Sequence, residues 1–276
     1  EKITNPVKGI KLLETEIVIE TNKKYILKKF DYDVNVSNKK FYTPNETIRQ
    51  KLGIDVVRYK AIYSIENNLP EDVVVGSYSD VLVALDNLGV HPEPLDYPEE
   101  LLSFAGRKIW KSTLFDVTQN VTDAINKESC HIFVKPLKDV KRFHGTVLNR
   151  CEDLIKLGGG VDDIDIWCSE YVQFVSEWRL WVLHGEIIGI NPYQGAWDVF
   201  PDVEILKKAV TAFKSAPSAY ALDFGITSEG KTLLVEVSDG YGLMSYGLHP
   251  EKYIQILITR WKELTKDASK FVMGGK

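Results

Sequence analysis

The sequence has few cysteines and no long apolar run, and both absences narrow the class of protein to which the chain can belong. Its three cysteines, Cys130, Cys151 and Cys168, are spread along the chain without the spacing of a metal site. Such an odd and sparse set is typical of reduced thiols in a cytosolic protein and argues against a disulfide scaffold. No segment approaches the roughly 20 apolar residues of a membrane-spanning helix, and no signal peptide is visible. We therefore expect a soluble, cytoplasmic protein with no membrane partner.

Two common signatures of nucleotide chemistry are also missing. No P-loop motif occurs. As a separate point, none of the five histidines stands in a motif with a nucleophile. Gly240 and Gly242 follow an apolar strand, as in a dinucleotide-binding turn, but Ser245 occupies the third glycine position. The fingerprint is therefore incomplete, and a Rossmann turn is not expected here.

The charge balance is mildly acidic. The chain has 276 residues, a net charge of −5 and a pI near 5.7, so a broad nucleic-acid footprint is absent. A short basic run at 138–142 leaves a local contact to nucleic acid open. The oligomeric state is not indicated by any pattern.

The first ninety residues read as a small α/β unit. Strands are expected at 16–20, 25–30 and 55–65, and a capped helix at 44–53. Residues 73–89 read as strand, turn and helix. A proline-rich connector at 91–98 then predicts a domain boundary.

The rest of the chain alternates strands with a few helices. Helical spacing is seen over 99–117, around Gly106, and over 202–216, with Val203, Leu206, Val210 and Phe213 on its apolar side. A final helix is expected at 250–264. Strands are predicted at 130–137, 163–172, 219–226 and 232–237, with a hairpin over 176–193 that turns at His184-Gly185. The connections between strands are too short for parallel crossovers, which predicts antiparallel sheets covered by helices, an α+β fold.

Two carboxylates lie in apolar strands near the C-terminus. Asp223 lies between Leu222 and Phe224, and Glu236 lies within the run 232–237. A short hairpin can bring the two face to face, where their like charges repel unless a cation lies between them. Hard oxygen ligands suit magnesium bound to phosphates. From these residues alone, a metal site and two solvated strand ends are equally supported.

Two cations lie in equally apolar strands. Lys135 lies in the strand 130–137, where either an edge position with the ammonium in solvent or a phosphate contact would explain it. Arg179 lies in the hairpin 176–193, as a partner for Glu177 or as a bidentate phosphate clamp. Buried cations together with buried carboxylates either neutralise one another or bind a metal–nucleotide complex.

In this order, the motifs resemble the ATP-grasp superfamily over residues 100 to 260. The matching stretches are "FVKPL", "CSEYV", "EWRLWVLHGEIIG", "ALDFG" and "LLVEVSD". The resemblance implies an α+β fold in which two subdomains clamp ATP. It further implies an ATP-grasp domain at 96–276, preceded by a small α/β domain at 1–95.

The resemblance assigns nucleotide contacts to several residues. Lys135 is similar to the lysine that contacts the α-phosphate and the adenine. Glu170 would accept from the exocyclic amine of adenine, and the backbone of Tyr171 and Val172 would contact the ring edge. Glu177 resembles the acid near the ribose or triphosphate, with a structural pairing to the arginine two residues later as an equal alternative.

The catalytic arginine and the metal ligands follow in the same way. Arg179 resembles the arginine that stabilises the transferred phosphate, and Asp223 and Glu236 would hold magnesium. The family has an asparagine two residues after the glutamate, where this chain has Ser238. Either the Ser238 hydroxyl or the adjacent Asp239 would complete the metal shell.

The phosphate loop also departs from the family. It is basic instead of glycine-rich, so Lys138 and Lys141 would supply charge in place of glycine amides, with Lys141 joining Arg179 as a catalytic residue. The helix lysine that the family directs at phosphate is assigned to Lys108, with Lys111 and Arg107 as alternatives.

The resemblance implies an ATP- and magnesium-dependent ligase that joins small-molecule or peptide carboxylates to amines through an acyl phosphate. Tyr193, Trp197, Tyr241 and Tyr246 are candidate substrate contacts or packing aromatics. Two alternatives stay open: a non-catalytic ATP-binding regulator or adaptor, and a ligase acting on a macromolecule. Ser238 and the basic loop are the features that favour them.

Overall fold

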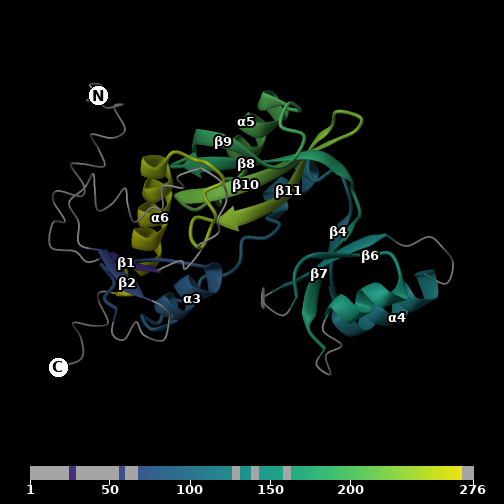
Figure 1. Cartoon of the computed structure of the whole chain (residues 1–276), viewed down its shortest axis with the longest axis horizontal. Helices are drawn as coiled ribbons and strands as arrows, with labels where there is room; N and C mark the ends of the chain where they lie inside the picture. Colours follow the sequence, from purple (N-terminus) through teal and green to yellow (C-terminus); the bar gives the residue numbers. More distant parts are fainter. Residues whose placement is uncertain are drawn as a thin grey trace, which may run out of the picture.

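A computed structural model describes residues 25–28, 56–59, 68–125, 131–137, 143–157 and 163–268 of the chain. These residues form one three-stranded and two four-stranded sheets (Figure 1). The expected elements at 16–20 and 44–53 lie outside the described residues, as do Lys138 and Lys141. No helix in the described ranges has the length and apolar character needed to cross a membrane.

The N-terminal sheet is parallel and has the order β2-β1-β3. Its strands are β1 (Tyr25–Lys28), β2 (Val56–Tyr59) and β3 (Val73–Val75). Helix α3 (Tyr78–Asp86) follows β3 and begins with a capping box between Ser77 and Asp80. The expected strand, turn and helix over 73–89 are thus confirmed, in a small α/β unit.

The central sheet is antiparallel, with the order β11-β10-β8-β9. Its strands are β8 (Phe174–Leu183), β9 (Glu186–Gly195), β10 (Ala219–Thr227) and β11 (Thr232–Asp239). The β8–β9 turn has positive φ at both His184 and Gly185, 50° and 77°, as a two-residue hairpin turn requires. The predicted hairpins 176–193 and 219–237 are both confirmed.

Helices cover both faces of the central sheet (Figure 1). On one face, α5 (Val203–Ala212) and the 3-10 helix η2 (Glu99–Phe104) pack against Leu180, Leu222 and Leu234. On the other face, α6 (Pro250–Thr265) and α3 enclose Trp181 and Ala221. Of the predicted apolar side of α5, Leu206 and Phe213 are buried, whereas Val203 is exposed, because it occupies the first position of the helix.

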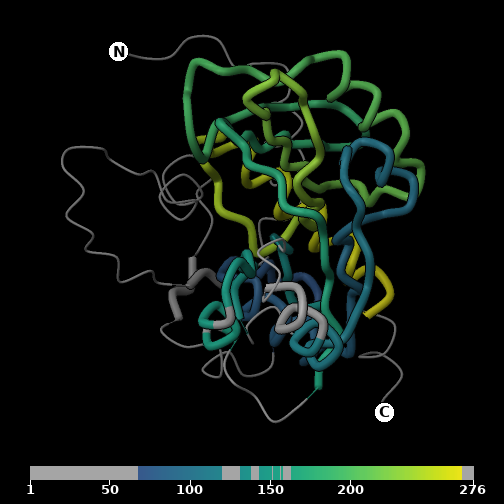
Figure 2. Tube along the Cα trace, turned by 90° about the vertical axis from the view of Figure 1, so that its right-hand side faces the viewer, coloured from purple at the N-terminus to yellow at the C-terminus, as the bar shows by residue number. Residues whose placement is uncertain are grey.

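The third sheet is also antiparallel and has the order β4-β7-β5-β6. It consists of β4 (Ile109–Thr113), β5 (Ile132–Pro136), β6 (Thr146–Leu148) and β7 (Asp165–Glu170). Helix α4 (Leu114–Ile125) and the 3-10 helix η3 (Cys151–Leu157) pack on one face of it, around Val134, Ile166 and Cys168. Figure 1 shows this sheet and α4 to the right of the central sheet, and Figure 2 views the molecule from that side.

The expected helix over 99–117 is wrong. Residues 99–104 form η2, 109–113 form the strand β4, and α4 begins only at Leu114. Gly106 has a φ of +60°, which ends the helical path, and β4 finds a pairing partner in β7 that periodicity alone cannot reveal. Lys108 and Lys111 are therefore not helix lysines.

Candidate functional site

A row of polar residues runs across the central sheet. In the strand register, Asp223 of β10 pairs with Arg179 of β8 on one side and with Glu236 of β11 on the other. Residues that pair directly across antiparallel strands share one face of the sheet. The predicted opposition of Asp223 and Glu236 across the hairpin is therefore present, and Arg179 joins the same row.

Arg179 and Asp223 form a buried, bidentate ion pair. Arg179 donates from Nε to Oδ1 at 2.7 Å and from Nη2 to Oδ2 at 2.6 Å. Burial raises the pKa of Asp223 to about 6 although Arg179 opposes the shift, and the charge of Glu236 adds to the rise. Arg179 therefore pairs with Asp223 and not with Glu177, the partner considered from the sequence. The carboxylate of Glu177 instead accepts from the Tyr193 hydroxyl at 2.7 Å.

Lys135 reaches the row from the third sheet. Its ammonium lies 3.3 Å from Glu236 Oε2 and 2.8 Å from Asp96 Oδ1, and only 12% of its side chain is exposed. Burial by itself would lower the pKa of Lys135, but Glu236, together with Tyr97 and Asp96, outweighs burial and keeps the pKa above its ordinary value. Lys135 is thus a desolvated, fully charged cation.

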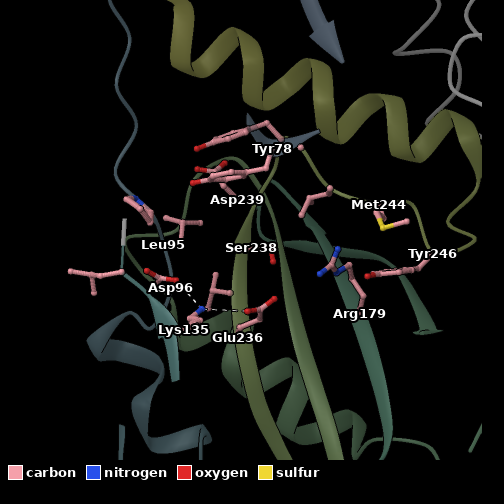
Figure 3. A pocket seen from close by; sticks show the side chains of 16 residues that line it. Tyr78, Leu95, Asp96, Lys135, Arg179, Glu236, Ser238, Asp239, Met244 and Tyr246 are labelled. Carbon is pink, nitrogen blue, oxygen red and sulfur yellow. Dashed lines mark hydrogen bonds and ion pairs between the residues drawn. The ribbon is translucent and has the colours of Figure 1, made fainter. Parts of the chain in front are cut away.

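Arg179 and Glu236 of the row line a cavity of about 270 Å³ (Figure 3), whereas Asp223 is buried between them and is not among its lining residues. Lys135, Arg179 and Glu236 form its charged side. Tyr241 and Tyr246, from the segment after β11, contribute to an aromatic and apolar side. A cavity with cations and carboxylates at one end and aromatic rings at the other can hold a charged group and an organic moiety together.

Aromatic rings surround the Arg179 guanidinium. Its central carbon lies 4.8 Å from the ring centre of Tyr246 and 5.9 Å from that of Tyr193, and these two rings stack at 4.9 Å. Trp181 lies on a further side, at 5.7 Å. Of the four aromatic candidates, Tyr241 and Tyr246 line the cavity, whereas Tyr193 and Trp197 are not among its lining residues, and Trp197 is 76% exposed.

The two candidates for a third metal ligand differ in their surroundings. Both carboxylate oxygens of Asp239 accept from the Arg260 guanidinium of α6, at 2.6 and 2.9 Å, and Oδ1 also accepts from the amide of Gly240. Ser238 lines the cavity two positions after Glu236. The geometry therefore leaves the Ser238 hydroxyl more available than the carboxylate of Asp239.

A second row crosses the third sheet. Lys135 of β5 and Lys111 of β4 both pair in register with Trp167 of β7, on the face opposite α4. The Lys111 ammonium lies 4.9 Å from the Trp167 ring centre. Lys108 instead lies over the ring of Trp110, which packs toward α4. Lys111 and not Lys108 thus shares a face with Lys135.

The predicted adenine-binding segment ends β7. Glu170 is exposed, and its Oε2 accepts from the amide of Lys108 at 2.8 Å. The amide of Tyr171 donates to the carbonyl of His131, and the Tyr171 side chain is 42% exposed. Val172 follows directly. These three residues lie at the third sheet and are not among the residues that line the cavity.

Asp96 is a site residue that the sequence did not single out. Its carboxylate accepts from Lys135 and, at 2.9 Å, from the indole of Trp167, while its backbone bridges to Val237 of β11. It lies in the proline-rich connector, where nothing in the local pattern marks an aspartate as functional. The sequence does not single out Arg260 either, because an arginine on a helix is usually exposed to solvent.

The donors at this site fit a magnesium ion that is also held by phosphates. The described residues contain no group of three or more His, Cys, Asp or Glu side chains arranged to hold a metal by themselves. Magnesium in nucleotide sites commonly takes one or two carboxylates and completes its shell with phosphate and water. Glu236 and Ser238 offer hard oxygen donors at the cavity, and Asp223 lies beside Glu236 with both of its oxygens held by Arg179.

Comparison with known proteins adds a family and several structural relatives. The model of the ATP-grasp domain, R2K clade family 2, matches residues 104–256. D-alanine–D-alanine ligase from Bacillus anthracis aligns with a TM-score of 0.54 at 15% identity, over 88% of this chain and 98% of that chain. The same ligase complexed with ATP aligns with a TM-score of 0.52 at 14% identity, over 88% and 98%.

A third relative is D-cycloserine synthetase DcsG. It aligns with a TM-score of 0.52 at 13% identity, over 87% of this chain and all (100%) of that chain. No curated protein matches the sequence. At such low identities the structural likeness establishes the fold.

Proposed function

The chain belongs to the ATP-grasp domains of the R2K clade, family 2, and on this premise we propose that it is an ATP- and magnesium-dependent carboxylate–amine ligase. One observation carries the proposal. Arg179, Asp223 and Glu236 form a single row on the central sheet, and Lys135 of the third sheet meets that row at the cavity. Cations and carboxylates from two sheets thus converge where a phosphoryl group and its metal would be held.

The proposed reaction has two steps. A carboxylate oxygen of the first substrate bonds to the γ-phosphorus of ATP as the bond to the β–γ bridging oxygen breaks, which releases ADP. The amine nitrogen of the second substrate then bonds to the acyl carbon and loses a proton, and inorganic phosphate leaves. No side chain forms a covalent intermediate, so positioning and charge stabilisation are the work of the protein.

The cations of the site would stabilise the transferred phosphoryl group. Lys135 and Arg179 are both desolvated and charged, and fixed charges in a site that excludes water stabilise developing charge without reorganising. Lys111, which shares a face with Lys135, is the better candidate for the second phosphate lysine than Lys108. Lys141 and Lys138 remain candidates from sequence alone.

Asp223, Glu236 and the hydroxyl of Ser238 would hold magnesium, which when bound neutralises phosphate charge. Glu236 is the residue most open to a ligand, since 37% of its side chain is exposed beside the cavity. Asp239 would instead fix the start of the following segment through Arg260.

The cavity favours small substrates. Its volume of about 270 Å³ lies just below the ~300 Å³ at which typical small-molecule pockets begin, which suits an amino acid or a short peptide end.

One feature favours the alternative of a nucleotide-binding module without ligase activity: both oxygens of Asp223 are already held by Arg179.

The test is ADP release. We expect a screen of amino acids and short peptides with Mg²⁺ and ATP to yield ADP and phosphate in a substrate-dependent manner. Glu236→Gln should lower turnover by about a hundredfold, as expected when a charge-stabilising group of a catalytic site is removed. Glu229→Gln, at the exposed β10–β11 turn, is the matched control. ATP binding without turnover for any substrate would favour the non-catalytic module.

A further inference from the structure

The strand that carries Glu236 contains a β-bulge directly before it. In the register of β10 and β11, Asp223 pairs with Glu236 and Phe224 pairs with Leu234, so Val235 has no partner on β10. A bulge of this kind places two residues of one strand opposite one residue of the other.

The bulge decides which face Glu236 occupies. Leu234 and Val237 are 1% and 5% exposed and pack in the same core, beneath α5, although they are three positions apart. In a regular strand, residues three apart point to opposite faces. The extra residue allows both to enter the core and leaves Glu236 and Ser238 facing the cavity. Without it, Glu236 would share the face of Leu234 and point at an apolar core.

Arg107 binds the bulge. Its guanidinium donates from Nη1 to the carbonyl of Leu234 at 2.7 Å and from Nη2 to the carbonyl of Val235 at 3.1 Å. Further donations go to the carbonyl of Ala105 and to the hydroxyl of Ser169 on β7. Burial lowers the pKa of Arg107, since these acceptors are uncharged. A bulge disrupts the ladder, and buried carbonyls left without donors are costly, so this fork stabilises the bulged form.

The loop that presents Arg107 is itself shaped to approach β11. Gly106 has a φ of +60°, and a Cβ atom there would come within 2.5 Å of the Leu233 side chain. The left-handed backbone at this position favours glycine, and the Leu233 side chain packs directly against it. Arg107 is thus held at the bulge by the loop before it and by Ser169 behind it.

We propose that Arg107 is a positioning residue for the metal ligand: it holds the bulge at Val235 and thereby turns Glu236 toward the cavity. Its role in the reaction is indirect and requires no contact with phosphate. The effect on the reaction rests on the proposed function. The claim that Arg107 holds the bulge depends only on the bulge itself.

The kinetic test uses Arg107→Gln. By analogy with lost supporting contacts at metal sites, we expect a rise of about tenfold or more in the Mg²⁺ concentration for half-maximal activity. The affinity for ATP measured in EDTA should stay within about twofold, because no phosphate contact is removed. Arg150→Gln, an exposed arginine, is the control, and should change neither value.

Two variants separate geometry from charge. Arg107→Lys keeps the charge but not the fork, so it should resemble Arg107→Gln, and methylguanidinium should partly restore Arg107→Gly. A parallel loss of ATP affinity in EDTA would instead make Arg107 a phosphate ligand. An unchanged magnesium requirement with a lowered melting temperature would make it merely structural. Either result overturns the proposal.

A crystal structure of Arg107→Gln without nucleotide reads the bulge directly. The proposal requires Val235 to regain a regular pairing or Glu236 to leave the cavity. An unaltered bulge would overturn it, whatever the enzyme does. If the wild-type protein shows no response to ATP and Mg²⁺, the proposed function fails, and this structural arm still decides the role of Arg107.

Discussion

At the scale of residues, two aspartates of the central sheet are each held by an arginine, but in different settings. Asp223 and Arg179 are neighbours across two strands of one sheet. Asp239 and Arg260 join the end of β11 to α6, and Arg260 also pairs with Glu263 at 2.9 Å. The pair of Asp223 and Arg179 belongs to the candidate catalytic row, whereas the pair of Asp239 and Arg260 connects the central sheet to helix α6.

This difference predicts the effect of Asp239→Asn. Asp239→Asn removes one of the two carboxylates that pair with Arg260 and leaves Glu263 as its ionic partner, so the free energy of unfolding should fall by about 1–3 kcal/mol in urea titrations. The affinity for Mg²⁺ and ATP of the folded variant should stay close to that of the wild type. Asp198→Asn, at an exposed position, serves as the control. A variant that keeps its stability but loses metal-dependent ATP binding would identify Asp239 as a ligand.

Cys168 is a further residue whose environment defines its role. Its side chain is buried in the core beneath α4, and burial raises the pKa of its thiol to about 12. A thiol that stays protonated at neutral pH is a poor nucleophile. Cys168 is therefore a core residue and not a nucleophile of the site.

At the scale of elements, the segment after β11 depends on two glycines. A Cβ atom at Gly240 would meet the carbonyl oxygen of Ala219 at 2.4 Å. At Gly242, which has a φ of +64°, it would meet Cα of Tyr78 at 2.4 Å. Tyr78 begins α3 and stacks on Tyr241 at 5.4 Å, so the close approach at Gly242 brings α3 against the segment that lines the cavity, whereas the approach at Gly240 joins this segment to β10.

We therefore expect Gly242→Ala to be more destabilising than Gly230→Ala. Both positions have positive φ, but a Cβ atom at Gly230 meets nothing within 4 Å. The left-handed backbone alone costs about 1–2 kcal/mol for an alanine. Overpacking against the Tyr78 backbone should add about 1–3 kcal/mol at Gly242. Equal losses in urea titrations of the two variants would show that the close approach is not limiting.

At the scale of the whole molecule, Asp96 links the two large sheets. It contacts Lys135 and Trp167 of the third sheet through its side chain and Val237 of the central sheet through its backbone. Its φ of 40° is unusual for a residue other than glycine. A strained residue with partners in both sheets is well placed to set their relative position at the cavity.

Asp96→Asn should loosen this connection. The variant keeps an acceptor for Trp167 but loses the charge that faces Lys135, so we expect faster amide exchange in β5 and β7 without unfolding of the central sheet. The KM for ATP should rise severalfold, since the cavity depends on both sheets. Asp116→Asn, exposed on α4, is the control. Unchanged exchange in the third sheet would contradict the linking role.

ATP binding should also be visible in the stability of the whole chain. A ligand at a hundred times its Kd stabilises the folded state by about 2.7 kcal/mol. For a protein of this size each kcal/mol corresponds to about 2–4 °C, so Mg²⁺ with ATP should raise the Tm by about 5–10 °C. EDTA should remove most of that shift. A Tm that does not respond to ATP and Mg²⁺ would contradict the nucleotide site itself.

Short-range pattern was sufficient for much of the fold and for part of the site. The opposition of Asp223 and Glu236 follows from a hairpin whose short turn sets the pairing, which the register confirms. The family resemblance rested on the same strands, and the family match covers them. The assignment of 99–117 failed because the partner of β4 lies over fifty residues away, in β7.

The sequence by itself determined most strands and the hairpin turns, because each depends on residues close together in the chain, and the order of these motifs identified the family. Only the tertiary structure decided which charges meet. Arg179 pairs with Asp223 instead of Glu177, Asp239 with Arg260, and Lys135 with Asp96 and Glu236. The physical reason is that a buried charge must find its partner wherever packing places one, and those partners lie 21 to 101 positions away along the chain.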